Sequence, residues 1–211
     1  MRLCSRNEHK RRELERALPW WTIELLEADE FPAEEGESYY ENARAKAWFG
    51  RKTGEPDVWM LGEDSGLEVE PLGGRPGIES NRWAGPGGAH VEKLLAELVG
   101  VGADTRRARY VCELVALSAA REEFRGTGTL GGRIAGEPRG SEGFGYDPVF
   151  VPEGETRTVA ELGNEWKAAN SHRARAARSL LDAMRTAAMG PLSLTGEGGF
   201  TPPEPPREKR V

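Results

Sequence analysis

The chain has 211 residues and a net charge of −6, from 35 acidic and 29 basic side chains. That length allows one large domain or two small lobes with a buried core, and the acidic balance argues against general nucleic-acid binding. Cys4 and Cys112 form no CxxC pair, so we expect reduced thiols and a cytoplasmic location. No apolar run approaches the roughly 18 residues of a membrane span, and we expect no membrane association.

The first residues predict a strand that feeds directly into a helix. Residues 1–5 are a short strand candidate, and Asn7 is a good N-cap for a helix striped by Leu14 and Ala17. The free N–H groups of a helix start favour an anion, and Arg6 and Lys10 add positive charge there. A solvated basic first turn is the alternative.

A second strand is expected over residues 21–26, followed by a helix that begins at Ser38. Ser38 and Glu41 have the spacing of a capping box, which gives Glu41 a structural role. The functional alternative makes Glu41 a metal ligand near the helix end, with Asn42 and Lys46 one turn apart on a polar face.

Two adjacent acids follow the apolar run of residues 58–61. Glu63 and Asp64 precede Ser65 and Gly66, so we expect a buried strand that ends in acids at the sheet edge, where α/β folds place ligands. Neighbouring carboxylates repel each other unless they share a cation or a proton. A simple polar turn is the alternative.

The middle of the chain predicts antiparallel strands. Alternation over residues 67–69 indicates a further short strand, residues 91–98 carry a helical stripe, and residues 109–116 and 124–134 read as strands. Together with the strand–helix opening, this predicts an α/β fold in which helices flank one long mixed sheet.

Two later segments carry polar groups at turns or helix starts. In residues 140–148, glycines on both sides of Phe144 would let a flat ligand approach and stack, or would form a tight loop with a core aromatic. Lys167 precedes His172 and Arg173, which open a long helix and point donors toward an anion or carbonyl, unless they are surface residues. We expect residues 191–211, rich in Gly, Pro and charge, to be disordered.

Together these segments resemble the inosine triphosphate pyrophosphatase family, from Ser5 to about Met184. The matching blocks, in chain order, are the phosphate-loop motif of residues 5–10, the ENAxxKA-type helix of residues 41–47, the EDSGL and LGGRPG segments of residues 63–67 and 72–77, the GFGYDP segment of residues 143–148, Lys167, and the SHR segment of residues 171–173.

The resemblance implies two lobes with a central nucleotide cleft, one domain over residues 1–190, and a homodimer. It implies Mg²⁺-dependent hydrolysis of ITP, dITP and XTP to the monophosphate and pyrophosphate. It assigns Asp64, Glu63 and Lys46 to catalysis and Glu41 and Asp64 to Mg²⁺. The substrate contacts that it implies are Ser5, Arg6, Asn7, Glu8, His9, Lys10, Ser65, Phe144, Gly145, Tyr146, Asp147, Lys167, His172 and Arg173.

Two rival functions stay open on the sequence. A Maf-like enzyme would catalyse the same hydrolysis on another modified nucleotide. A non-catalytic nucleotide-binding protein would bind a nucleotide without hydrolysing it. Glu63 also departs from the family pattern, because many members carry Asp there, which is shorter but equally charged.

Overall fold

The computed structural model describes residues 1–85 and 89–189. Within them the strands are β1 (Arg2–Leu3), β2 (Glu24–Leu25), β3 (Met60–Val69), β4 (Pro76–Gly77), β5 (Arg107–Leu117), β6 (Glu123–Ile134) and β7 (Phe150–Pro152). The helices are α1 (Glu8–Ala17), α2 (Tyr39–Thr53), α3 (His90–Glu97), α4 (Val159–Asn170) and α5 (His172–Met189), with 3₁₀ turns at Glu70–Leu72 and Ala103–Thr105. The predicted tail of residues 191–211 lies outside the described residues.

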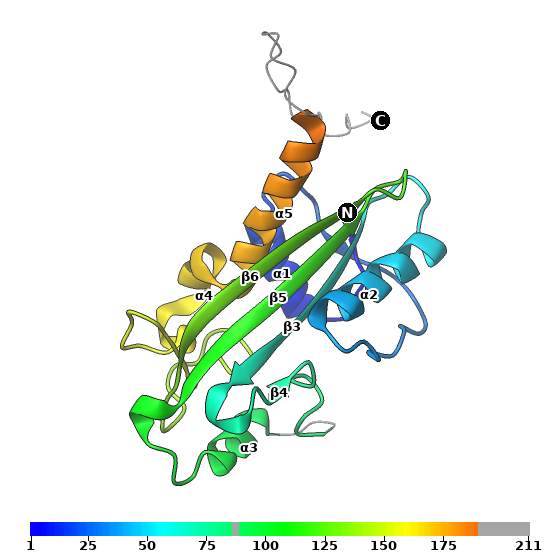
Figure 1. Cartoon of the computed structure of the whole chain (residues 1–211). Helices are drawn as coiled ribbons and strands as arrows, with labels where there is room; N and C mark the ends of the chain where they lie inside the picture. Colours follow the sequence, from blue (N-terminus) through cyan, green and yellow to red (C-terminus); the bar gives the residue numbers. More distant parts are fainter. Residues whose placement is uncertain (86–88, 190–211) are drawn as a thin grey trace.

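The strands form one mixed sheet in the order β2-β1-β3-β5-β6-β7, with β4 also paired to β3. β1 runs parallel to β2 and β3, whereas β3, β5, β6 and β7 are successively antiparallel. The long β5–β6 hairpin crosses the whole molecule (Figure 1). The predicted α/β fold with one long mixed sheet is therefore confirmed.

Helices cover both faces of this sheet. α2 packs on β3 and β5 from one side, called here the α2 face, while α1 and α5 lie on the other side, the α1/α5 face (Figure 1). Glycines in the strands allow this close packing. A Cβ at Gly62 would lie 1.8 Å from the carbonyl oxygen of Ala43 in α2, and one at Gly128 would lie 2.1 Å from that of His172 in α5.

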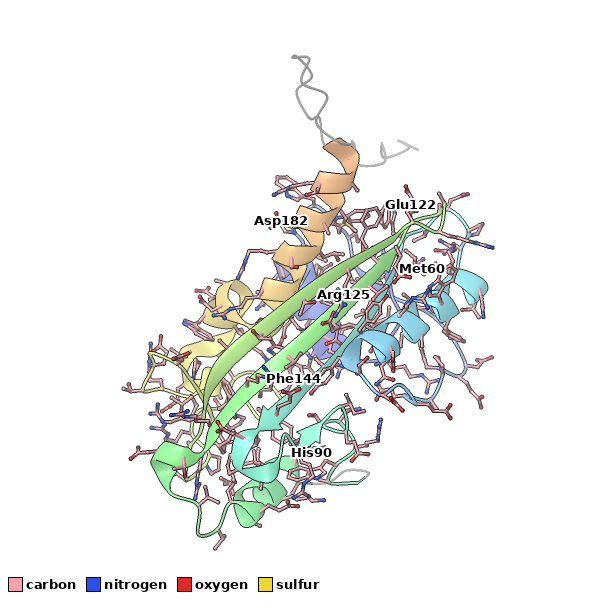
Figure 2. The ribbon with its side chains drawn as sticks, viewed as in Figure 1. Met60, His90, Glu122, Arg125, Phe144 and Asp182 are labelled. Atoms are coloured by element: carbon pink, nitrogen blue, oxygen red, sulfur yellow. The ribbon has the colours of Figure 1, made fainter. Side chains whose placement is uncertain are left out.

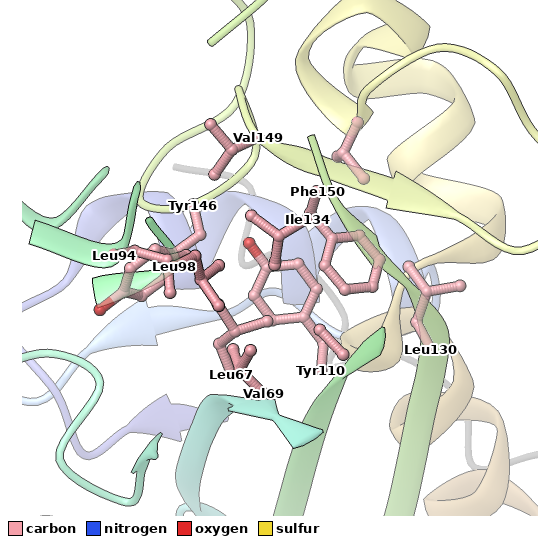
Figure 3. Packing of buried hydrophobic residues seen from close by; sticks show 12 residues of the cluster. Leu67, Val69, Leu94, Leu98, Tyr110, Leu130, Ile134, Tyr146, Val149 and Phe150 are labelled. Carbon is pink, nitrogen blue, oxygen red and sulfur yellow. The ribbon is translucent and has the colours of Figure 1, made fainter. Parts of the chain in front are cut away.

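Side chains fill the molecule on both sides of the strands (Figure 2). One apolar cluster occupies the part of the sheet near α3 and includes Leu67, Leu94, Tyr110 and Phe150 (Figure 3). A second cluster joins α1 and α5 to the sheet, and a third lies under α2. No helix within residues 1–85 and 89–189 is long and apolar enough to span a bilayer.

The helix starts follow their capping residues. Asn7 caps α1 by accepting from the Lys10 N–H, and Thr158 caps α4 in a complete capping box with Glu161. Ser38 caps α2 through the Glu41 N–H, but the Glu41 carboxylate accepts from the N–H of Glu37. The capping box expected at Ser38 is therefore only half formed.

Two strand predictions were wrong in extent. The second strand is confined to Glu24–Leu25, within the expected residues 21–26. β3 does not end before the acids but runs from Met60 to Val69, so that residues 67–69 belong to the same strand. Each residue of β3 has a partner in β5, from Met60 opposite Leu117 to Val69 opposite Ala108, and this pairing carries the strand through its polar centre.

Candidate active site

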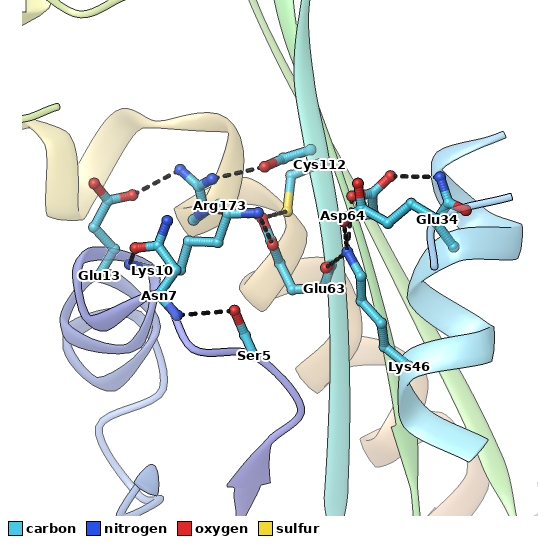
Figure 4. A network of polar contacts seen from close by, with 12 residues as sticks. Ser5, Asn7, Lys10, Glu13, Glu34, Lys46, Glu63, Asp64, Cys112 and Arg173 are labelled. Carbon is cyan, nitrogen blue, oxygen red and sulfur yellow. Dashed lines mark hydrogen bonds and ion pairs between the residues drawn. The ribbon is translucent and has the colours of Figure 1, made fainter. Parts of the chain in front are cut away.

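The two adjacent acids lie in the middle of β3 and point to opposite faces of the sheet. Side chains alternate along a strand, and Figure 4 shows Glu63 directed toward α1 and α5 while Asp64 is directed toward α2. The expectation that these acids lie at a strand end is therefore wrong. The strand divides the acidic pair between two differently charged environments.

Glu63 is held by two cations on the α1/α5 face. Its side chain is 0% exposed, and its carboxylate lies 2.6 Å from Lys10 Nζ and 3.0 Å from Arg173 Nε. Burial alone would raise the pKa of Glu63, but Lys10 and Arg173 outweigh it and lower that pKa. Glu63 is therefore ionised at neutral pH, and it fixes Lys10 and Arg173 beside each other.

Asp64 faces the polar side of α2. Its carboxylate accepts from Lys46 Nζ at 3.0 Å and from Asn42 Nδ2 at 3.1 Å. Burial raises the pKa of Asp64, against the opposing effect of Lys46. A carboxylate whose pKa is raised holds a proton more readily than an ordinary aspartate, which suits a group that accepts one from water.

Lys46 connects Asp64 to the loop before α2. Its ammonium also donates to the backbone oxygen of Glu63 at 3.1 Å and to Glu34 Oε1 at 2.5 Å. Burial would lower the pKa of Lys46, but Asp64 and Glu34 raise it, so the ammonium stays charged.

A cavity of about 100 Å³ lies on the α1/α5 face of β3. Most of the residues predicted to bind substrate line it: Asn7, Lys10, Ser65, Phe144, Gly145, Tyr146, Asp147, Lys167, His172 and Arg173. The lining is completed by Gly66, Leu67, Ser80, Asn81, His90 and Tyr110. Helices α1, α4 and α5 supply one wall, and residues 80, 81 and 90 supply another, so two parts of the chain meet across the cavity.

Phe144 forms an aromatic platform in this cavity. Its ring stacks on that of His9 at 5.1 Å, and Lys167 Nζ and Arg173 Cζ lie 4.2 and 5.3 Å from its centroid. The positive φ of Gly143 and Gly145, 79° and 63°, allows the turn that presents this ring.

Asp147 organises the base of the same loop. It accepts from Lys167 Nζ at 2.5 Å, from the Phe144 N–H at 2.8 Å and from Tyr110 Oη at 3.3 Å. Burial raises the pKa of Asp147, although Lys167 acts against this. The loop is therefore tied to both β5 and α4.

His172 presents an unpaired polar atom. Its ring stacks on that of Tyr110 at 4.6 Å and 11°, and its Nδ1 is buried without a hydrogen-bond partner among the described residues. Burial, with Arg173 and Lys167 nearby, lowers the pKa of His172 well below its usual value. The imidazole is therefore neutral, and its open nitrogen is available to a ligand.

Some predicted residues are placed elsewhere. The Arg6 guanidinium bonds to the backbone oxygens of Ala28 and Asp29, and Glu8 pairs with Arg11 and Arg12 on the surface of α1. Both line a wider, open hollow of about 870 Å³ that contains neither Glu63 nor Asp64. Ser5 also lines that hollow, and its Oγ accepts from the Asn7 N–H at 3.1 Å.

The sequence did not single out Glu13, Glu34 or Tyr110. Glu13 pairs with Lys167 at 2.5 Å and Arg173 at 3.0 Å, and so joins α1 to α4 and α5. Its position three residues after Lys10 on one helix face was a usable signal. Glu34 lies in a loop without periodicity, and Tyr110 reads as a core residue of β5, so neither carried such a signal.

Asp64 and Glu41, the predicted Mg²⁺ ligands, carry carboxylate oxygens, the ligand type that a hard divalent cation prefers. Within residues 1–85 and 89–189, no three His, Cys, Asp or Glu side chains gather as a ready-made metal cluster. Mg²⁺ needs only one or two carboxylates, because waters and substrate phosphates complete its octahedron. The oxygens of Asp64 and Glu34 already converge on one positive atom, Lys46 Nζ. Glu41 is exposed, and Asn42 beside it bonds to Asp64.

Comparison with known proteins gives consistent matches. The chain is 44% identical over 156 residues to a dITP/XTP pyrophosphatase of Bdellovibrio bacteriovorus, covering 72% of this chain and 78% of the relative. It is 40% identical over 184 residues to a dITP/XTP pyrophosphatase of Methylacidiphilum infernorum, covering 84% and 90%.

Solved structures agree with these relatives. The Ham1 protein of Staphylococcus aureus superposes with a TM-score of 0.73 at 32% identity, covering 90% of this chain and 97% of that one. The Ham1 protein of Coxiella burnetii gives 0.75 at 31%, covering 87% and 97%. The Ham1 family model matches residues 1–183, and this chain therefore belongs to the Ham1 family.

Proposed function

We propose that this protein hydrolyses the deaminated purine nucleotides ITP, dITP and XTP to the nucleoside monophosphate and pyrophosphate. The proposal is based on one observation: the two faces of β3 have different chemical environments. An aromatic and cationic cavity lies on one side at Ser65, and a buried aspartate held by a lysine lies on the other at Asp64. The relatives named dITP/XTP pyrophosphatases point to the same activity.

The base would occupy the cavity against Phe144. Lys167 and Arg173 place donors beside this ring, and His172 adds an open ring nitrogen to the lining of the same cavity. Donors aimed at a 6-keto oxygen accept hypoxanthine and xanthine. The 6-amino group of adenine would leave the same donors buried and unpaired, which disfavours ATP.

The triphosphate would extend from this cavity past the start of α1. Asn7 and Lys10 line the cavity there, and Lys46 approaches β3 from the other face. Hydrolysis of a phosphoric anhydride depends on positioning and on neutralising charge. The two lysines supply fixed positive charge for this purpose.

Asp64 would accept the proton of the attacking water at the α-phosphorus. Its raised pKa and its hydrogen bonds to Lys46 and Asn42 hold the carboxylate ready for this role. Asp64 and Glu41 would hold Mg²⁺, which supplies charge neutralisation at the phosphates when it is bound. Glu63 supports the site by fixing Lys10 and Arg173.

Pyrophosphate release from a panel of nucleotides tests the function. The full-length protein with Mg²⁺ should release pyrophosphate from ITP, dITP and XTP with a kcat/KM at least about a hundredfold above that for ATP, as expected for a site whose buried donors need a partner. Preferential turnover of dUTP or a methylated nucleotide would favour the Maf-like alternative. Binding of ITP without any product would favour a nucleotide-binding protein.

The proposed homodimer has a separate test. Light scattering behind size-exclusion chromatography should give twice the mass of 23.2 kDa for the chain. A monomeric mass would remove the dimer from the proposal and leave the reaction unaffected.

A further inference from the structure

Glu34 occupies a position that its sequence does not explain. It lies in residues 26–37, which form neither helix nor strand, yet its carboxylate bonds to two cations from different elements. Oε1 lies 2.5 Å from Lys46 Nζ on α2, and Oε2 lies 3.0 Å from Arg82 Nη1. A second Arg82 nitrogen reaches the Glu34 backbone oxygen at 3.4 Å.

The Glu34 carboxylate is not needed to compensate the charge of Lys46. Lys46 already has Asp64 and the Glu63 backbone oxygen as acceptors. A third acid close to Asp64 adds like-charge repulsion, since both carboxylates lie within 3.0 Å of Lys46 Nζ. Glu34 is tolerated there because Lys46 and Arg82 both face it.

Lys46 and Arg82 have the arrangement of an anion site. A lysine and an arginine from separate segments converge on one pair of oxygens, and Arg82 follows Asn81, which lines the cavity. Arginine and lysine side chains bind phosphate oxygens through the same contacts that they make to a carboxylate.

We propose that Lys46 and Arg82 form a phosphate-binding subsite, and that Glu34 fills this subsite as an internal stand-in anion until the polyphosphate of the nucleotide displaces it. This inference rests on the proposed function, since it assigns part of the substrate to a place beside Asp64. It adds Arg82 to the phosphate contacts and gives residues 26–37 a role as a strap that opens on binding.

The contact between Glu34 and Arg82 is weak enough to be exchanged. The side chain of Glu34 is 25% exposed and that of Arg82 is 45% exposed, so their pairing is screened by solvent. A pyrophosphate group carries more charge and more acceptor oxygens than one carboxylate. The exchange keeps both cations paired and releases Glu34 to water.

If Glu34 instead positioned Lys46 for the phosphates, removing its charge would change phosphate affinity in the opposite direction. If Glu34 served to hold Lys46 in place for the phosphates, removing its charge would weaken phosphate binding. If Glu34 is a competitor for Lys46 and Arg82, removing its charge strengthens that binding. One neutral, isosteric substitution therefore separates the two roles.

The test is calorimetric titration of the full-length protein with inorganic pyrophosphate, in EDTA and without nucleotide. We expect Glu34→Gln to bind pyrophosphate about three- to tenfold more tightly than wild type, and Arg82→Gln at least about fivefold more weakly, which are shifts typical of one partly exposed charge. Glu34→Asp keeps the charge and should bind pyrophosphate like wild type.

Matched controls separate a local contact from net charge. Glu35→Gln removes an exposed acid from the next position, and Arg121→Gln removes an exposed arginine from the turn between β5 and β6. Both should change pyrophosphate affinity less than about twofold, because an exposed charge that forms no ion pair with Lys46 or Arg82 is weakened by solvent screening. Thermal unfolding of each variant confirms that it is folded.

The outcomes distinguish this inference from the proposed function. Unchanged or weaker binding by Glu34→Gln, or unchanged binding by Arg82→Gln, would overturn the inference even if the protein hydrolyses dITP. The expected pattern with pyrophosphate, in a protein that turns over no deaminated nucleotide, would support the subsite and refute the proposed function.

Discussion

The ion pairs of Glu63 give a prediction that links stability to the site. Glu63→Gln keeps the size of a fully buried side chain and removes the charge that Lys10 and Arg173 share. Removing one partner of a buried pair costs about 3–5 kcal/mol, because the remaining charge is left without compensation. Lys10 is 14% exposed and can turn toward water, and Arg173 keeps Glu13, so we expect a loss of about 3 kcal/mol.

The effect of Glu63 on stability also has a defined pH dependence. The folded pKa of Glu63 lies below the ordinary value of 4.5. A group whose pKa is lowered by folding stabilises the protein above the unfolded pKa, and this stabilisation is lost as pH falls toward the folded pKa. The difference between wild type and Glu63→Gln should therefore be full at pH 7 and should shrink below about pH 4.5.

Equilibrium unfolding in urea, followed by tryptophan fluorescence, measures this difference. The midpoint should fall while the slope with denaturant stays constant. Glu15→Gln serves as the control, since Glu15 pairs with Arg11 on the surface of α1 at 42% exposure and should cost much less. A loss below about 1 kcal/mol for Glu63→Gln, or one unchanged between pH 7 and pH 3.5, would refute the assigned burial and pairing.

Three further changes test the base platform, the helix packing and a cap. Phe144→Ala should raise the KM for dITP about tenfold with little change in kcat, since base stacking on an aromatic ring is worth about 1–3 kcal/mol; an unchanged KM in steady-state kinetics would place the base elsewhere. Gly128→Ala should lower the free energy of unfolding in urea by about 3 kcal/mol or more, because the added Cβ meets the α5 backbone at 2.1 Å. Gly136→Ala should be nearly neutral, since a Cβ there has nothing within 4 Å. Equal effects of the two substitutions would contradict the packing of α5. Thr158→Ala should cost about 1–2 kcal/mol by the same measurement, through loss of the α4 cap, and a neutral result would show that the capping box is dispensable.

The local signals in the sequence predicted the helix starts and the mixed sheet. Asn7 and Ser38 act through side-chain bonds to N–H groups within three residues, so their effect is visible in a short window. The strands expected over residues 109–116 and 124–134 were likewise predicted from the residue types within each segment. These elements were predictable because their causes are local.

The course of β3 was not predictable for the opposite reason. The first apolar run ends at Leu61, but the strand continues because β5 pairs with it residue by residue. Its polar centre is packed against α2 on one face and paired with Lys10 of α1 and Arg173 of α5 on the other. Polar residues inside a buried strand break the usual pattern, as functional sites do. The pattern therefore placed a strand end at the point where the strand turns its two acids to opposite faces.

The candidate site likewise has residues that the sequence indicated and residues that only the tertiary structure shows. The family resemblance pointed to Lys10, Asp147 and Lys167, and the fold brings these together around one cavity. The helix spacing of Glu13 after Lys10 hinted at Glu13, but its pairing with Arg173 and that of Glu34 with Arg82 join residues far apart in the chain. Such pairings depend on the tertiary structure, which a single sequence does not display.

The role of Asp64 as proton acceptor is the central chemical claim. The most direct measurement is the rate of pyrophosphate release from dITP by Asp64→Asn, with Mg²⁺ and saturating substrate. Glu113→Gln is the matched control, because Glu113 lies opposite Asp64 in β5, is also buried, and pairs with Arg125 and Thr127. Loss of a general base typically costs about 10²–10⁴-fold in rate, so we predict a kcat at least about a hundredfold below wild type for Asp64→Asn and a change below about threefold for folded Glu113→Gln. Release by Asp64→Asn at the wild-type rate would contradict the account.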